Sequence, residues 1–310
     1  MPLKLRENIM RVVFFIAALA SILAVILICV FLFAQGIPAI GRIGVLDFIL
    51  GQRWAPLAGE PSFGILPFIL GSIYVTTGAI ILGVPIGLLM AIYLARMCPK
   101  PIYRIIKPAI NLMAGVPSVI YGFFGIVVLV PLMFDTFRHS VPMRSGETML
   151  AASVILAIMI LPTVINIAET NLRAVPQELY EAAVALGASH ERAVFKVILP
   201  AAKSGVMAAV VLGIGRAIGE TMAVNMIAGN SPAMRMPHEL FSSIRTLTAN
   251  IVIEMSYVEH GSTHYGALIA TGVVLFIFIM IINLLLSILN KDKDRRGRKK
   301  KTAAAELETL

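Results

Sequence analysis

Residues 206–228 read Val-Met-Ala-Ala-Val-Val-Leu-Gly-Ile-Gly-Arg-Ala-Ile-Gly-Glu-Thr-Met-Ala-Val-Asn-Met-Ile-Ala, an apolar run interrupted by two charged side chains, Arg216 and Glu220. About 20 apolar residues suffice to cross a bilayer as a helix. An ionised side chain at the bilayer centre costs roughly 2.5–3.5 kcal/mol, so it is rarely present without a function. A spacing of four residues places both side chains on one helical face and predicts that they pair. The run therefore predicts a membrane protein with a charged site inside the membrane.

The composition extends this prediction to the whole chain. Of 310 residues, 58% are hydrophobic and only 14% are charged, with a mean hydropathy of +0.90. A water-soluble fold needs more polar surface than this. We predict an all-α bundle of six transmembrane helices, over residues 12–33, 65–94, 108–134, 149–167, 206–228 and 266–289.

The positions of Lys and Arg predict the orientation. They concentrate in the N-terminal segment, in the second and fourth loops and in the tail, which includes the basic run 291–301. Cytoplasmic loops carry such an excess, so both termini are expected in the cytoplasm. The basic tail follows the last span directly, which favours contact with anionic lipid over binding of nucleic acid.

The loops and bends are also predicted. An external loop at 35–64 is expected to hold a short interfacial helix, with Trp54 near the lipid head groups. A second external loop, 230–265, is expected to be helical around 239–254. Pro117 should bend the third span, and Gly83, Pro85 and Gly87 offer a bend in the second.

The longest cytoplasmic loop, 171–203, has the pattern of a helix–turn–helix. A helix should begin after Pro176, continue through residues 181–186 and end at Gly187. A second helix is expected from His190 and should end before Pro200. Such a unit either docks into a partner or only connects two spans.

The residues of this loop resemble the coupling loop of ABC importer permeases. The matching positions are Glu181-Ala182-Ala183, then Gly187, then Val197-Ile198-Leu199-Pro200. The resemblance implies that this loop sits in a cleft of an ATP-binding subunit. Small residues at Ala182, Ala183 and Gly187 would then permit close approach, and Glu181 would pair with a basic group of the partner.

Further motifs resemble the permeases of phosphate ABC importers, over about residues 64–289. They are Gly-Val-Pro-Ser-Val-Ile-Tyr-Gly-Phe-Phe-Gly at 115–125, Leu-Arg-Ala-Val-Pro at 172–176, Gly-Ile-Gly-Arg-Ala-Ile-Gly-Glu-Thr-Met-Ala-Val at 213–224, and Gly-Asn-Ser-Pro at 229–232. The Glu-Thr-Met-Ala-Val and Gly-Asn-Ser-Pro stretches favour the PstC type of subunit over the PstA type.

This resemblance implies a division of the chain and a set of partners. Residues 1–290 would form the permease domain, with its core at 64–289 and its coupling loop at 171–203, and residues 291–310 a cytoplasmic tail. A PstA-like permease subunit, two PstB-like ATP-binding subunits and a periplasmic phosphate-binding protein are expected. ATP and magnesium would belong to the partners, and no cofactor is expected on this chain.

Chemistry independently makes Arg216 a candidate for binding the transported anion. A site inside the membrane must replace the water around phosphate with positive charge and hydrogen-bond donors, and a guanidinium can bind two oxygens at once. Glu220 would keep Arg216 paired when no ion is bound. The alternative is a structural ion pair that joins two helices. The candidate pathway residues are Arg216, Glu220, Thr221, Ser118 and Tyr121, although Ser and Thr side chains often bond to their own helix.

Three polar or small features are expected to be structural. Glu169 near the end of the fourth span should be a solvated end charge, and His260 and His264 should belong to a polar loop rather than a metal site. Gly215 and Gly219 should let the fifth span pack closely against a neighbour.

Three alternatives to a phosphate permease remain. A permease for sulfate or molybdate would use the same chemistry, since an Arg does not specify its anion. A passive anion channel would not explain the coupling loop. An intramembrane enzyme would need a catalytic constellation, and no nucleotide-binding or hydrolase motif is present in the sequence.

Overall fold

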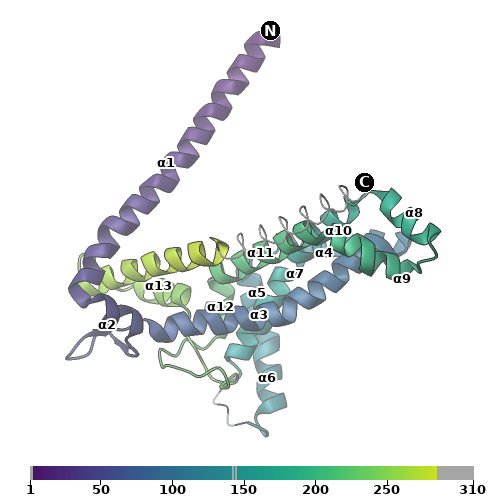
Figure 1. Ribbon diagram of the computed structural model, residues 1–310. Helices are drawn as coiled ribbons and strands as arrows, with labels where there is room; N and C mark the ends of the chain where they lie inside the picture. Colours follow the sequence, from purple (N-terminus) through teal and green to yellow (C-terminus); the bar gives the residue numbers. More distant parts are fainter. Residues whose placement is uncertain (1–2, 142, 144, 285–310) are drawn as a thin grey trace, which may run out of the picture.

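The computed structural model describes residues 3–141, 143 and 145–284. Figure 1 shows a long helical bundle whose main helices run side by side. The end of the bundle that was predicted to be external carries a two-stranded antiparallel hairpin, β1 (Trp54–Ala55) with β2 (Ser62–Phe63). The helices are α1 (Leu3–Ile43), α2 (Val45–Leu50), α3 (Leu66–Ile92), η1 (Tyr93–Met97), α4 (Lys100–Gly115), α5 (Ser118–Phe124), η2 (Gly125–Leu129), α6 (Val130–Phe137), α7 (Met149–Arg173), α8 (Gln177–Ala185), α9 (His190–Ala193), η3 (Val194–Ile198), α10 (Leu199–Ala201), α11 (Lys203–Gly219), α12 (Met222–Ile227) and α13 (Leu247–Met255), followed by a helix over Thr263–Leu284.

The predicted all-α membrane fold is confirmed. Five helices are long and apolar enough to cross a bilayer, and a bent pair, His190–Ala201 with Lys203–Gly219, raises the number to as many as six. The five are Glu7–Ile43, Leu66–Met97, Ser118–Phe137, Met149–Arg173 and Thr263–Leu284. The chain is therefore a multi-pass membrane protein. The basic tail and the boundary at residue 290 lie outside the described residues.

Helices α3 and α7 form the centre of the bundle because glycines on α3 let the two backbones approach. A Cβ built on Gly83 would lie 2.9 Å from Cδ1 of Ile160, and one on Gly87 would lie 3.0 Å from Cγ1 of Val164. Residue numbers rise together along this contact, so the two helices run parallel. Helix α3 continues through Pro85 to Ile92 as one helix. Gly83 and Gly87, which the sequence offered as a possible bend, instead allow close packing of α3 against α7.

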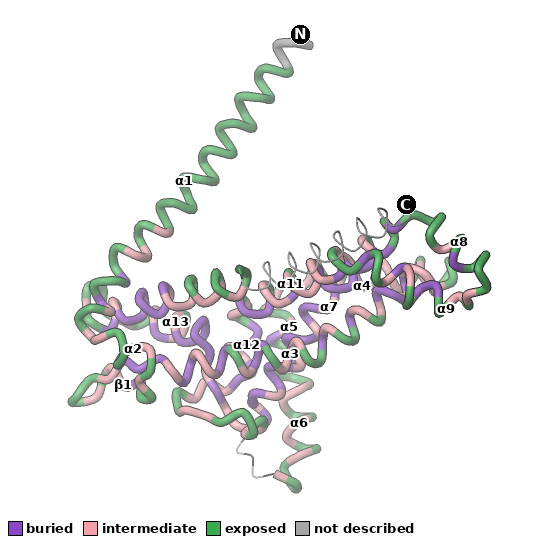
Figure 2. Tube along the Cα trace, viewed as in Figure 1, coloured by how far each residue is buried: buried purple, intermediate pink, exposed green. Residues whose placement is uncertain are grey.

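Helix α1 leaves the bundle for most of its length. Its N-terminal part projects alone in Figure 1 and is exposed in Figure 2. Only its last turns pack, against the helix Thr263–Leu284: the rings of Phe33 and Phe276 meet edge to face at 5.7 Å. An apolar surface that is exposed all round suits lipid or another membrane subunit.

The external end is held by a buried charged cluster around Glu254. Both carboxylate oxygens of Glu254 accept from Trp54 Nε1 at 2.9 Å. Arg245 Nη1 donates to Oε1 at 2.8 Å, and His264 Nε2 lies 2.7 Å from Oε2. One prediction was therefore wrong, because His264 belongs to this buried cluster rather than to a plain polar loop. Trp54 is buried as well, and its position near the lipid head groups stays a prediction. The sequence could not show this, because the partners lie far apart along the chain.

The external helices differ in extent from the prediction. The short helix expected in the first external loop is present as α2. The helix expected around 239–254 is present only as α13, Leu247–Met255.

The loop 171–203 forms the predicted helical hairpin. Helix α8 ends before Gly187, whose φ of +82° is a left-handed conformation that glycine adopts without strain. The second helix does not end before Pro200, as predicted, but continues to Ala201. The π-helical turn η3 explains the difference, since the wider turn admits Pro200 near the start of α10.

Candidate functional site: two adjacent helix breaks

The fifth predicted span is broken at Glu220. Helix α11 ends at Gly219, Glu220 is extended with φ −71° and ψ 131°, and α12 begins at Met222. The Glu220 Oε1 atom accepts the backbone N–H of Ala223 at 3.2 Å, and so satisfies one free donor at the start of α12. The single helix predicted over residues 206–228 was therefore wrong.

The third predicted span is broken at Pro117, where a bend was expected. Helix α4 ends at Gly115, Val116 is extended, and α5 begins at Ser118. A proline disfavours helical geometry at the residue before it, which accounts for the break. Tyr121 crosses the break, because its hydroxyl donates to the carbonyl oxygen of Met113 at 2.8 Å. The same oxygen also accepts the backbone N–H of Val116 at 3.3 Å, so Tyr121 adds a second hydrogen bond at the end of α4.

The two breaks are neighbours in space, because the segments that follow them pack together. A Cβ on Gly122 of α5 would lie 3.2 Å from Cα of Ala223 on α12 and 2.6 Å from Sδ of Met226. Gly125, one turn on, faces Ile227 in the same way. Non-helical backbone at membrane depth is stable only where it is buried in protein or lines a water-filled cavity. Two such points side by side are typical of a transport site.

Arg216 lies on the last turn of α11, directly before one of these breaks. Its Nη1 donates to Oγ1 of Thr163 on α7 at 2.9 Å, while the side chain as a whole stays exposed. No ion pair joins Arg216 to Glu220. The predicted pairing was wrong because it assumed a continuous helix, and α11 stops before Glu220. Thr163 is a partner that the sequence analysis missed.

The remaining predicted residues have different surroundings. Thr221 Oγ1 donates to the carbonyl oxygen of Gly219 at 3.4 Å, and Ser118 is half-buried at the start of α5. Gly219 has nothing within 4 Å of an added Cβ, and Gly215 only Asn283 Oδ1 at 3.8 Å. The close helix packing expected at this glycine pair is absent. On α11 it occurs instead at Gly213, against Val164 of α7.

Glu169 was wrongly predicted to be a solvated end charge. Its side chain is only 2% exposed, and Lys107 Nζ on α4 lies 2.6 Å from its Oε2. Arg173 Nε and the Tyr103 hydroxyl donate to Oε1 at 2.8 and 2.9 Å. Lys107 also donates to Asn166 Oδ1 at 2.7 Å. The Glu169 carboxylate links α7 to α4. Because Lys107 and Glu169 lie 62 positions apart, their spacing in the sequence could not predict this contact.

Arg96 joins the bundle to the coupling loop. One guanidinium nitrogen donates to the carbonyl oxygens of Leu172 and Val175 at 2.9 and 3.0 Å, and the other donates to Gln177 Oε1 at 3.0 Å. Gln177 is the first residue of α8. The start of the cytoplasmic hairpin is therefore fixed to the end of η1.

The predicted coupling residues divide into two sets. Glu181, Ala182, Gly187 and Pro200 are exposed, as a docking surface requires, whereas Ala183 is buried and Leu199 is partly buried within this chain. Four large apolar side chains on the hairpin are also exposed: Leu186 at 90%, and Leu179, Val184 and Phe195 at 43% each. Among the residues of the predicted coupling motif, Ala183 and Leu199 thus support the hairpin itself.

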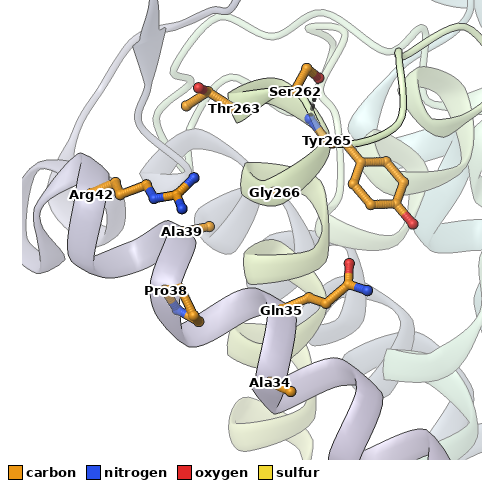
Figure 3. A pocket seen from close by; sticks show the side chains of 10 residues that line it. Ala34, Gln35, Pro38, Ala39, Arg42, Ser262, Thr263, Tyr265 and Gly266 are labelled. Atoms are coloured by element: carbon orange, nitrogen blue, oxygen red, sulfur yellow. Dashed lines mark hydrogen bonds between the residues drawn. The ribbon is translucent and has the colours of Figure 1, made fainter.

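A cavity of about 290 Å³ lies far from these breaks, between α1 and the start of the helix Thr263–Leu284. Figure 3 shows Arg42 and Gln35 on α1 facing Thr263 and Tyr265 across it. None of the predicted pathway residues lines this cavity. The side chain of Arg216 is exposed and does not belong to this cavity.

Comparison with known proteins gives the family. A probable ABC transporter permease protein YqgH of Bacillus subtilis is 35% identical over 283 residues, which cover 89% of this chain and 90% of that protein. A phosphate transport system permease protein PstC of Mesorhizobium japonicum is 34% identical and covers 85% of this chain and 84% of the relative. One of Haemophilus influenzae is 33% identical, with coverages of 77% and 79%.

Two solved structures share the fold. A methionine ABC transporter, MetNI, in an inward-facing conformation matches with a TM-score of 0.56 and 20% identity, over 74% of this chain and 95% of that chain. A bacterial ABC transporter involved in the import of the polysaccharide alginate matches with a TM-score of 0.59 and 14% identity, over 93% and 99%.

These findings and the geometry define the class of protein: a membrane subunit of a transporter, whose relatives are named permeases rather than enzymes. Residues 83–295 match the family described as the binding-protein-dependent transport system inner membrane component, and the chain belongs to it. The resemblance drawn from the sequence motifs is confirmed at the level of the family.

Proposed function

We propose that this chain is one half of the pore of an ATP-driven importer of inorganic phosphate. Its relatives named PstC support the choice of phosphate. The proposal includes alternating access to the two sides of the inner membrane, with both termini in the cytoplasm.

The observation that carries the proposal is the environment of Arg216. Its guanidinium is exposed on the side of a transmembrane helix, has no carboxylate partner in the part of the chain that the structure describes, and donates one hydrogen bond to Thr163. An arginine that faced lipid here would be costly. It is tolerated if it faces a water-filled passage between this chain and a second subunit. Its remaining donors are then free to bind two oxygens of an anion.

Because this chain would supply only half of the pore, other subunits must complete the transporter. A PstA-like subunit supplies the other wall, and a periplasmic phosphate-binding protein delivers the ion to the external loops. Two PstB-like ATP-binding subunits carry ATP and magnesium, one of them docked on the hairpin that exposes Glu181, Ala182 and Leu186. Motion of α8 on ATP binding reaches the bundle through Arg96, because Arg96 holds the start of that helix.

Replacement of Arg216 tests the proposal. The complete transporter with Arg216→Gln should assemble with its ATPase but lose uptake of ³²P-phosphate, since glutamine is polar but shorter and carries no positive charge. Arg138→Gln, in an exposed position on the external side, is the matched control and should transport normally. Normal uptake by Arg216→Gln would contradict the role of this site.

Two rival functions are separated by the same assay. If the substrate is another oxyanion, excess sulfate or molybdate should block phosphate uptake by the wild-type transporter. If the chain forms a passive channel, uptake should continue without ATP.

A further inference from the structure

Glu220 carries a carboxylate at the break, and among the described residues no cation forms an ion pair with it. It lines a small cavity whose other polar residues carry only hydroxyl groups: Ser72, Thr76, Thr246 and Thr248. All four are at most 8% exposed. The volume is about 10 Å³, which is room for a group the size of one water molecule. A carboxylate in such a place can accept a hydrogen bond from a hydroxyl-bearing ligand but offers no attraction to a bare anion.

The hydroxyl groups around it are held in place by the fold. Ser72 Oγ accepts the backbone N–H of Leu247 at 3.0 Å, and Thr246 Oγ1 accepts that of Ala249 at 3.2 Å. Thr248 Oγ1 lies 3.1 Å from Thr246 Oγ1 and 3.4 Å from the carbonyl oxygen of Glu220. Helix α13 therefore holds the backbone of Glu220 through Thr248, and the start of α12 holds its carboxylate through the N–H of Ala223. A rigid acceptor is what discrimination between similar ions requires.

Glu220 also lies close to Arg216 along the chain. Four residues of helix rise only about 6 Å, and α11 remains helical up to Gly219. An oxyanion on the Arg216 guanidinium can therefore direct one oxygen toward Glu220. Because the two side chains do not pair with each other, both remain available to it.

The chemistry of the candidate ions then decides what this carboxylate accepts. At neutral pH, inorganic phosphate keeps at least one P–O–H group. Arsenate likewise keeps at least one As–O–H group. Sulfate and molybdate are fully deprotonated and offer a carboxylate only repulsion. A site that hydrogen-bonds a ligand hydroxyl rejects analogues that lack it by large factors, and a repulsive element adds to specificity.

We propose that Glu220 is the specificity-determining residue of the pore, which accepts the O–H of a protonated oxyanion and repels oxyanions that have none. This inference rests on the proposed function, because it assigns the selectivity of the same site. The competing role is purely structural, since Glu220 Oε1 also caps α12. Glutamine retains that acceptor oxygen but loses the charge, so Glu220→Gln separates the two roles.

The test measures displacement of bound ³²P-phosphate from the purified permease–ATPase complex. The binding protein is left out, because it would filter ions before they reach the pore. In the wild-type complex, arsenate should displace phosphate and sulfate should be at least about 100-fold weaker. In the Glu220→Gln complex, sulfate should come within about tenfold of phosphate. Glu259→Gln, in the exposed external loop, is the matched control for loss of one negative charge and should behave as wild type.

Three results would overturn the inference: sulfate displacing phosphate from the wild-type complex, Glu220→Gln keeping full discrimination, or an assembled Glu220→Gln complex that binds no anion. If that variant does not assemble, Glu220→Asp takes its place, and it must still prefer arsenate to sulfate. A wild-type complex that binds no phosphate at all would instead count against the proposed function.

Discussion

Lys107 in the middle of α4 and Glu169 near the C-terminal end of α7 form a short ion pair, with 2.6 Å between Nζ and Oε2. Ile110 is the one buried residue of α4. The charged pair therefore contributes much of what keeps α4, and the break that follows it, against the bundle.

Loss of the Glu169 charge should loosen this end of the molecule. Removal of one partner of a buried ion pair costs about 3–5 kcal/mol, and Glu169→Gln leaves both Lys107 and Arg173 without their carboxylate. We expect a lower midpoint of thermal unfolding for the purified complex in detergent. The control is Asp135→Asn, which breaks an exposed pair with Arg138 and should cost less than about 1 kcal/mol. Equal effects of the two variants would show that Glu169 is not structurally important.

Trp54 provides an optical probe of the external end, because it is the only tryptophan in the chain. It is 7% exposed and bound to Glu254, so its fluorescence emission should be that of a buried indole. In Glu254→Ala, Arg245 and the indole N–H lose their acceptor, and the emission should shift to the red with a fall in thermal stability. Glu60→Ala, exposed near the β-hairpin, should leave both unchanged. An unshifted spectrum in Glu254→Ala would contradict the contact.

Gly83 should be far less tolerant of alanine than Gly41, although both lie within helices. An added Cβ at Gly83 meets Ile160 Cδ1 at 2.9 Å and the Ala157 oxygen at 3.0 Å, whereas at Gly41 it meets nothing within 4 Å. Overpacking typically costs about 1–3 kcal/mol, and alanine in an open helix gains up to about 1 kcal/mol over glycine. Thermal unfolding of the two variants should therefore move in opposite directions, and a stabilised Gly83→Ala would refute tight α3–α7 packing.

Gly187 should be needed for coupling rather than for folding of the bundle. Its φ of +82° would cost a residue with a Cβ about 1–2 kcal/mol, so Gly187→Val should distort the turn between α8 and α9. We expect phosphate uptake and transport-linked ATP hydrolysis to fall together, while thermal stability changes little. Gly187→Asn, which tolerates this conformation better, should retain more activity, and equal activities would argue against a conformational role.

The sequence predicted the parts of this structure that depend on local composition. Long apolar runs located the spans, and Pro176, Gly187 and Pro117 marked one helix start, one helix end and one break, because each acts through its own backbone. The break at Glu220 was not predicted, because no proline marks it and the average hydropathy of the segment is the same whether it forms one helix or two. The contacts of Glu169 with Lys107 and of Trp54 with Glu254 were also not predicted. Each joins residues about 60 or 200 positions apart, and only the fold brings such residues together.

The solitary first helix has a consequence for biosynthesis. Because α1 makes so few contacts before its last turns, its entry into the bilayer does not have to wait for the helices that it later meets. It can leave the ribosome, insert, and set the direction of every later crossing while the remainder of the polypeptide is still being made.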